Sequence, residues 1–345
     1  MTLIYFILIL GTIVFIHELG HFIFAKKAGI YCYEFSIGMG PKIFGKKFKS
    51  ETEYCIRAIP LGGFVSMAGE TVEEDKNIPK DKQLQNKTWL QRFLTIFAGP
   101  FFNFVLAFIL LFLIGIIFGA PSTKPIVGAV QEDSAAYEAG LEAGDRILSI
   151  NNKKVSNWDQ IIMKLQLNNT GKKVTFEIKK ENGTIQEIIV KPKKVIVDEQ
   201  TTYQFGVGME QNKYYGFVES IKYATSKIGS LTESMFTVIG GLFTGKVSLS
   251  NISGPVGIYS VVGDSAKAGF DSILYLIAYL SINVGFINLI PFPAFDGGRI
   301  LFLIIEKVKG SPVSPKVENM MHNIGFFLLI GLMILITFSD ILRLF

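Results

Sequence analysis

Two histidines and a glutamate lie close together near the start of this chain. They belong to the sequence HELGH, in which His17 and His21 are four residues apart and Glu18 follows the first histidine. On a helix, this spacing puts both imidazoles on one face, where they can bind one Zn²⁺ ion while the glutamate acts as a general base. Because the chain has only 3 histidines, the pattern indicates a metal site and not a chance arrangement.

The HELGH sequence lies inside a long apolar segment, residues 2–25. A charged side chain at the centre of a membrane helix costs about 2.5–3.5 kcal/mol, so an ionisable cluster there needs compensation. A metal that binds the imidazoles and attracts the carboxylate provides it. We read the segment as a retained span, because it has no basic region before it and no small-residue cleavage site after it.

A third metal ligand must come from elsewhere, because a catalytic zinc site has three protein ligands and an open position for water. If the N-terminus lies outside, His17 and His21 are about 24 to 30 Å along the first helix, toward the cytoplasmic side. Asp296 follows a later apolar segment by a comparable run, and His322 opens the last one from the cytoplasmic side. Position alone leaves both residues as candidates.

The composition predicts a membrane protein. Of the 345 residues, 49% are apolar, and they gather in long uncharged runs. A helix needs roughly 20 residues to cross the hydrocarbon core. The segments that meet this requirement are 2–25, 93–118, 272–294 and 322–342. We therefore predict a polytopic α-helical membrane protein with four transmembrane helices.

Charge and cysteine content exclude several other classes. The net charge is +5, but the lysines lie in loops beside apolar segments, which indicates topology and contact with the lipid bilayer, not nucleic-acid binding. Cys32 and Cys55 form no CxxC pattern, so they indicate neither a disulfide framework nor a cysteine-ligated metal. We expect both cysteines to be buried as small apolar residues.

Basic residues beside the spans predict the orientation, since they mark the cytoplasmic side. They follow the first span (Lys26, Lys27, Lys42, Lys46, Lys47 and Lys49), precede the second (Lys87 and Arg92) and follow the third (Arg299, Lys307, Lys309 and Lys316). The loop between the first and second spans and the loop after the third span are therefore expected in the cytoplasm. The N-terminus, residues 119–271 and the C-terminus are expected outside.

Residues 30–68 alternate and turn, with glycines at several turns, which predicts a membrane-associated β-hairpin or sheet. An edge strand within 54–67 could hold an extended substrate by adding it to the sheet. Proline substitution at Ile56 or Ala58 would test this, because proline removes a main-chain donor.

The outer segment contains a small α+β unit, about 125–195. Its strand-like runs are PIVGAV, RILSINNKKV, KVTFEIKK and IQEIIVKP, and helical pieces lie near 135–140 and 158–167. Gly140 follows a short helix, and Gly144 and Asp145 then turn into a strand. This order resembles the PDZ domain of bacterial proteases, and we assign residues 119–200 to it.

Residues 201–271 are predicted to hold an amphipathic helix and a hinge region. Apolar residues recur at steps of three and four: Phe217, Ile221, Ala224, Ile228, Leu231, Met235, Val238 and Leu242. The helix could lie on the membrane or pack on the spans. Gly240, Gly241, Gly245 and Gly254-Pro255 indicate the hinge.

HELGH in the first span, together with NLIPFPAFDGG (Asn288 to Gly298) ending a late one, resembles the site-2 protease family of intramembrane zinc metalloproteases. Bacterial RseP-type members are the most similar, here with room for a single PDZ domain. The segments SIGMG, IPLGGFVSM, AGPFFNF and SGPVGI match as well. The protease core would then comprise residues 1–118 and 272–345.

The family pattern N-x-x-P-x-P-x-L-D-G maps onto Asn288, Pro291, Pro293, Asp296 and Gly297. The resemblance implies that Asp296 is the third ligand of one Zn²⁺ per chain, and that Asn288 contacts the substrate backbone or stabilises the transition state. Phe295 stands where the family usually has leucine, an apolar exchange.

The resemblance implies regulated intramembrane proteolysis in the bacterial cytoplasmic membrane. Glu18 would deprotonate zinc-bound water for attack on the polarised carbonyl and return the proton to the leaving amine. The implied substrates are membrane-spanning proteins already trimmed outside, such as anti-sigma factors, or signal-peptide remnants. The PDZ domain would exclude untrimmed proteins or bind new C-termini.

Two other classes of protein share some of these features. A metal transporter would also place histidine and aspartate inside spans, but it needs ligands along a path through the bilayer, whereas these lie at one depth. A membrane scaffold with a PDZ domain gives no reason for Glu18. Replacing Glu18 with glutamine separates the three, since only a protease loses proteolysis while keeping its zinc.

Overall fold

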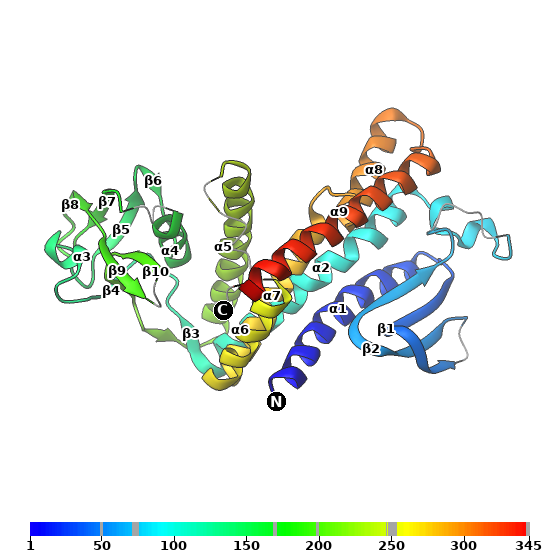
Figure 1. Ribbon diagram of the computed structural model, residues 1–345, viewed down its shortest axis with the longest axis horizontal. Coiled ribbons are helices and arrows are strands. Elements are labelled where there is room, and N and C mark those ends of the chain that lie inside the picture. The colour runs from blue at the N-terminus through cyan, green and yellow to red at the C-terminus, as the bar shows by residue number, and fades with distance from the viewer. Residues whose placement is uncertain are drawn as a thin grey trace. The chain divides into compact units, whose positions relative to one another are not determined.

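The computed structural model describes residues 1–48, 51–70, 76–167, 171–197, 200–245, 247 and 254–342. The chain divides into two compact units, one of residues 1–110 and 249–345 and one of residues 111–248. HELGH and Asp296 belong to the first unit, which contains the blue and red ribbons of Figure 1. The green strands belong to the second, and each unit is described by itself.

Four helices in the described part of the chain are long and apolar enough to cross a membrane. They are α1 (Thr2–Lys27), α2 (Trp89–Ile114, continued by the π-helical turn η3, Gly115–Gly119), α7 (Phe270–Leu289) and α9 (Pro315–Leu342). They correspond to the four predicted spans. Among these helices and the loops, the first unit also contains two short 3₁₀ turns, η1 (Lys80–Lys82) and η2 (Leu84–Asn86), and helix α6 (Pro255–Ala268).

The third span is shorter than predicted, because α7 ends at Leu289 and not near residue 294. Ile290 is extended, with ψ of 135°, as expected for a residue before proline. The chain resumes as α8 (Asp296–Lys309). Asp296 is therefore the first residue of a new helix, set off from α7 by the proline-containing segment.

Two glycines allow α1 and α2 to approach closely. A Cβ on Gly20 would overlap the carbonyl group of Ala98, and a Cβ on Gly99 would overlap the imidazole of His21. Since the interior of a protein has little room for an extra methyl group, no larger residue fits either position without a shift of backbone or ring. The contact between these helices brings HELGH against α2.

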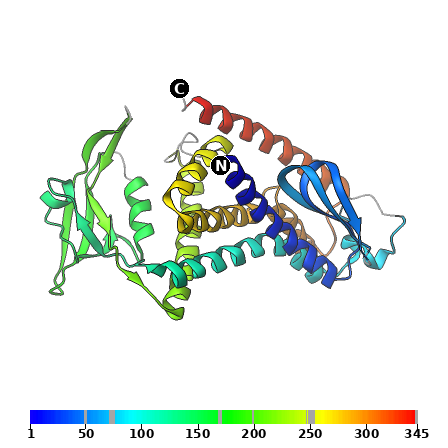
Figure 2. The same ribbon diagram turned by 90° about the horizontal axis from the view of Figure 1, so that it is seen from below.

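The predicted hairpin is present as β1 (Cys32–Lys47) and β2 (Glu53–Met67), beside the C-terminal end of α1 (Figures 1 and 2). Both strands bend sharply, with positive φ at Gly38, Gly40 and Gly62, so each pairs twice with the other. Cys32 and Cys55 are buried and free, as expected.

The double pairing corrects the predicted edge strand. Ile56 pairs with Ile37 on one side and with Phe44 on the other, so the first half of β2 lies inside the sheet. The second half, residues 63–67, pairs with β1 on one side only within the described residues. A proline at Ile56 would break the interior of the sheet and would not probe its edge.

The second unit has the predicted order of strands and helices. Its elements are β3 (Ala120–Pro121), β4 (Val127–Val130), α3 (Ala135–Glu138), β5 (Arg146–Ile150), β6 (Lys153–Lys154), α4 (Trp158–Leu167), β7 (Val174–Lys179), β8 (Ile185–Val190), β9 (Lys193–Val197), β10 (Gln200–Gln204), β11 (Val207–Met209) and β12 (Lys213–Tyr214). A sheet ordered β6-β5-β7-β8 forms the framework. Ile147, Ile161 and Phe176 are fully buried in its core.

The predicted amphipathic helix is α5 (Phe217–Phe243). It contacts α4 through polar groups: Lys227 Nζ lies 2.7 Å from Asp159 Oδ1, and Ser230 Oγ donates to Asp159 Oδ2 at 2.6 Å. At its N-terminal end, α5 also packs on the end of the second span, where the ring centroids of Phe217 and Phe112 are 5.3 Å apart, as one of the two predicted arrangements has it. Of the predicted hinge glycines, Gly240 and Gly241 lie within α5, and Pro255 begins α6. Ser253, the first residue of the SGPVGI segment, lies outside the described residues.

Candidate active site

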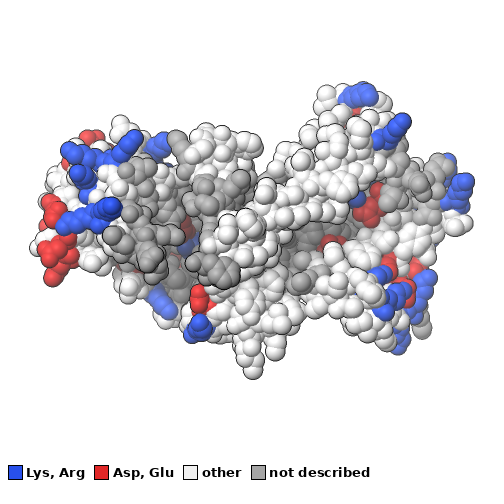
Figure 3. Space-filling view, in the orientation of Figure 1, with Lys and Arg blue, Asp and Glu red and all other residues white. Residues whose placement is uncertain are grey.

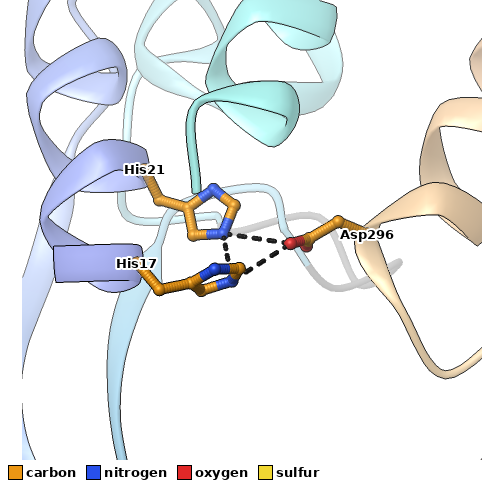
Figure 4. Close-up of side chains that lie close together, drawn as sticks. All are labelled: His17, His21 and Asp296. Carbon is orange, nitrogen blue, oxygen red and sulfur yellow. Dashed lines mark hydrogen bonds and ion pairs between the residues drawn. The ribbon is translucent and has the colours of Figure 1, made fainter. Parts of the chain in front are cut away.

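The side chains of His17, His21 and Asp296 converge at one point, although Asp296 comes from the far end of the sequence (Figure 4). The two Nε2 atoms are 3.2 Å apart. Asp296 Oδ2 lies 3.2 Å from His17 Nε2 and 3.4 Å from His21 Nε2. Both histidines are 8% exposed.

These three atoms fit one tetrahedral zinc ion. Ligand atoms at about 2.0–2.1 Å from a tetrahedral Zn²⁺ are about 3.3 Å from one another. The three separations of 3.2, 3.2 and 3.4 Å agree with this spacing. Two imidazoles and one carboxylate also make up a known donor set of catalytic zinc sites, one that leaves the fourth position open.

Helix α2 contacts the other nitrogen of both histidines. His21 Nδ1 lies 2.8 Å from the carbonyl oxygen of Thr95, an acceptor, so Nδ1 carries the proton and Nε2 has a free lone pair. His17 Nδ1 lies 3.2 Å from Nδ2 of Asn103. The ring orientations are therefore set by a helix that supplies no ligand itself.

Glu18 lies beside this cluster and contacts the hairpin. Its Oε2 accepts a hydrogen bond from the backbone N–H of Val65 at 3.1 Å. Glu18 and the three converging residues line one cavity of about 250 Å³. The proposed base, the candidate ligands and the outer edge of β2 thus surround the same space.

Asn288 and His322 also line this cavity, but neither belongs to the cluster. Asn288, in the last turn of α7, donates from Nδ2 to the carbonyl oxygen of Val284 at 3.0 Å. His322 Nε2 is 3.9 Å from Glu318 Oε1. The fold brings Asp296, and not His322, to the two histidines; the role of Asn288 stays a prediction.

An ion pair in the cavity wall was not anticipated from the sequence. Arg299 Nη1 lies 2.6 Å from Glu70 Oε1 and so joins α8 to the end of the hairpin. Burial opposes the charge of Arg299, but the acidic groups around it, Glu70 first and then Asp296 and Glu318, outweigh burial and raise the pKa of the guanidinium. Arg299 follows Asp296 by three residues, about one helical turn. This spacing in the sequence could have indicated that Arg299 faces the same side of the helix as Asp296.

Other contacts hold α8 against α2. Arg92 forms an ion pair with Glu306, and Trp89 Nε1 donates to the carbonyl oxygen of Leu303 at 2.8 Å.

A second group with metal-binding atoms, Glu34, Glu53 and Cys55, is already neutralised. Arg57 and Lys42 form ion pairs with its two carboxylates, each at 2.8 Å.

The chain matches peptidase family M50 over residues 5–332. It is 35% identical to the zinc metalloprotease RasP of Bacillus licheniformis over an alignment of 421 residues, which covers 100% of this chain and 99% of that protein. It is also 35% identical to the regulator of sigma-W protease RasP of Bacillus subtilis over 422 residues, with the same coverage. Zinc metalloprotease RasP of Geobacillus kaustophilus is 35% identical over 419 residues, covering 100% and 98%. With its full-length similarity and its HELGH sequence, the chain belongs to peptidase family M50 and is a zinc metalloprotease.

Proposed function

We propose that this metalloprotease cleaves peptide bonds within membrane-spanning segments, using one zinc ion held by His17, His21 and Asp296. The convergence of these three side chains at zinc-ligand spacing carries the proposal. Two of them lie in α1, one of the four helices that fit a multi-pass membrane protein. A transporter is disfavoured, because the candidate ligands meet at a single point and do not follow a path.

Glu18 acts as the general base and then as the general acid. When bound, zinc polarises the scissile carbonyl and lowers the pKa of a water ligand. Glu18 would take a proton from the water that attacks the scissile carbonyl and would deliver it to the leaving amine as the C–N bond breaks. The hydrogen bond from Val65 to Oε2 holds the carboxylate in place and leaves its other oxygen, Oε1, available for proton transfer.

The outer edge of β2 holds the substrate in an extended form. The peptide bonds of a helical substrate are tied up in its own hydrogen bonds, so the substrate must unwind before cleavage. Residues 63–67 present an edge at the cavity, with the N–H of Val65 directed away from β1. A substrate strand that adds to this edge would lie beside Glu18.

The proposed location is the bacterial cytoplasmic membrane, with both termini and the α+β unit outside. Large apolar side chains on α9 support lipid contact: Phe327 is 71% exposed and Leu335 is 65% exposed. On the face shown in Figure 3, the surface over the first half of α1 and the middle of α9 carries no charged side chains. The lysines near the hairpin and α8 support a site that opens toward the cytoplasm.

We further propose that the α+β unit is a PDZ domain and that the substrates are anti-sigma factors or signal-peptide remnants, already trimmed outside. The order of strands and helices in the unit supports the first part. The name of the Bacillus subtilis relative, a regulator of sigma-W protease, supports the second.

Trapping substrates in cells with Glu18→Gln tests the function. We expect this variant to retain zinc, to lose cleavage, and to accumulate single-span proteins whose outer domains have been removed. The matched control is wild-type protein expressed at the same level. Accumulation of soluble proteins alone, or unchanged cleavage of a trimmed single-span protein by the variant, would contradict the proposal.

A further inference from the structure

We propose that Asn103 is a positioning residue that fixes the tautomer of His17, with its amide oxygen accepting a hydrogen bond from Nδ1–H. The inference rests on the proposed metal site and adds a residue to it. Asn103 belongs to the AGPFFNF segment, which the sequence matched to the start of the second span without assigning it a chemical role.

Asn103 is completely buried on α2 and faces His17. Its Nδ2 atom lies 3.2 Å from His17 Nδ1, and no hydrogen-bond partner is found for its Oδ1 within the described residues. Burying an amide inside an apolar helix costs free energy of desolvation, which a hydrogen bond must offset. Among the described residues, the contact with the His17 imidazole is the one that can do so.

The metal requires a particular tautomer of His17. Nε2 faces His21 and Asp296, so it must offer its lone pair to the ion, and the ring proton must then lie on Nδ1. An amide NH₂ group facing Nδ1 would demand the opposite tautomer, with the proton on Nε2. That arrangement would block the metal position.

Rotation of the amide by 180° about its terminal torsion exchanges Oδ1 and Nδ2 at nearly the same positions. Oδ1 then lies where it accepts from Nδ1–H. Either orientation leaves one amide atom without a partner, so the count of unsatisfied groups does not distinguish them. The tautomer that the metal requires of His17, with the proton on Nδ1, does distinguish them. It selects the orientation in which the amide oxygen faces the ring.

The backbone around Asn103 is fixed by neighbouring helices. Ser281 Oγ on α7 donates to the carbonyl oxygen of Asn103 at 3.0 Å. A Cβ on Gly285 would lie only 3.0 Å from the carbonyl oxygen of Pro100, so α7 also packs closely against this part of α2. Asn103 therefore performs for His17 what the carbonyl of Thr95 performs for His21, from a rigid position.

Zinc affinity of the purified full-length protein, measured by competition with a chelator, tests the role without relying on catalysis. Asn103→Leu keeps the approximate shape but removes the acceptor, and we expect zinc affinity to fall by about 10- to 100-fold. Asn103→Asp keeps an acceptor oxygen and has no donor, so we expect affinity at or above that of the wild type. The control is Asn283→Leu, which removes another membrane-helix amide, from a half-buried residue whose buried Oδ1 lacks a partner among the described residues.

The aspartate variant decides the question even if the leucine variant does not fold. If Asn103→Asp loses zinc, the amide acts as a donor or as a spacer and the proposal is wrong. Unchanged affinity in Asn103→Leu, or an equal loss in Asn283→Leu, would also overturn it. His17→Ala separates this inference from the metal site itself: if that variant keeps full affinity, the proposed zinc site fails, whatever Asn103 does.

Discussion

The backbone N–H of Val65 donates a hydrogen bond to Oε2 of Glu18 across 3.1 Å. One residue thus links the outer edge of the hairpin to the proposed general base. A substrate strand at that edge would lie beside a base that the edge itself holds in place, so binding in an extended form and positioning for cleavage would be coupled.

Val65→Pro tests this link, since proline removes the N–H but is tolerated on edge strands. We expect cleavage of a trimmed single-span substrate to fall about 10- to 100-fold, because a hydrogen bond to a charged group contributes roughly 1.5–3 kcal/mol. Zinc content should not change. The control Val65→Ala keeps the N–H and should remain active; equal losses in the two variants would assign the effect to the side chain.

Asp296→Asn and His322→Ala distinguish the two candidates for the third ligand. The uncharged amide is a poor zinc ligand, so Asp296→Asn should lose its metal during dialysis against a chelator, while His322→Ala should keep one zinc per chain. Elemental analysis of the dialysed proteins measures this. The opposite pattern would mean that α9, and not α8, completes the site.

Gly99→Ala should disturb the site without touching a candidate ligand. The added Cβ would overlap the His21 imidazole, so the ring or helix α2 must shift, at a cost of about 1–3 kcal/mol for overpacking. We expect lower zinc affinity and a lower melting temperature. Gly331→Ala in α9 is the matched control, because nothing lies within 4 Å of a Cβ at that position. Zinc affinity equal to that of the control would show that α2 does not constrain His21.

Lys180 should stabilise the second unit over a defined pH range. Its Nζ donates to the carbonyl oxygen of Gly140 at 3.0 Å and lies 2.9 Å from Glu142 Oε2 and 3.0 Å from Asp145 Oδ2. Burial opposes the charge of Lys180, but the hydrogen bonds to Glu142 and Asp145 outweigh it and raise the pKa of the ammonium group. Because Asp145 is 1% exposed, Lys180→Met should lower the free energy of unfolding by about 1–3 kcal/mol.

The pH dependence of this difference follows from the direction of the shift. The folded-state pKa of Lys180 lies above its unfolded value, so the stabilisation is complete below a pH of about 10.4 and is lost as the pH rises through the raised value. Urea unfolding followed by Trp158 fluorescence, in a Trp89→Phe background, measures it. The difference in unfolding free energy between the protein with Lys180 and the Lys180→Met variant should stay constant from neutral to mildly alkaline pH. A difference that vanishes near neutral pH would contradict the assignment.

Features that depend on local periodicity could be inferred from the amino-acid sequence alone. Two histidines four residues apart share a helix face wherever that helix lies, so His17, Glu18 and His21 could be identified as the start of a metal site. Uncharged runs of sufficient length predicted the four spans, and alternating runs predicted the strands of the second unit. Membership of peptidase family M50 agrees with the resemblance inferred from HELGH and NLIPFPAFDGG.

The choice between residues on different elements depends on how the chain packs in three dimensions. Asp296 and His322 were both reasonable ligands by position, and the choice depends on where α8 begins after the proline-containing break. The inner and outer halves of β2 could not be distinguished, because a chain that folds back at Gly38, Gly40 and Gly62 pairs on two sides. The contact of Asn103 with His17 depends on how closely α1 and α2 approach at Gly20 and Gly99. Such distances arise from the packing of distant segments, which local sequence patterns do not specify.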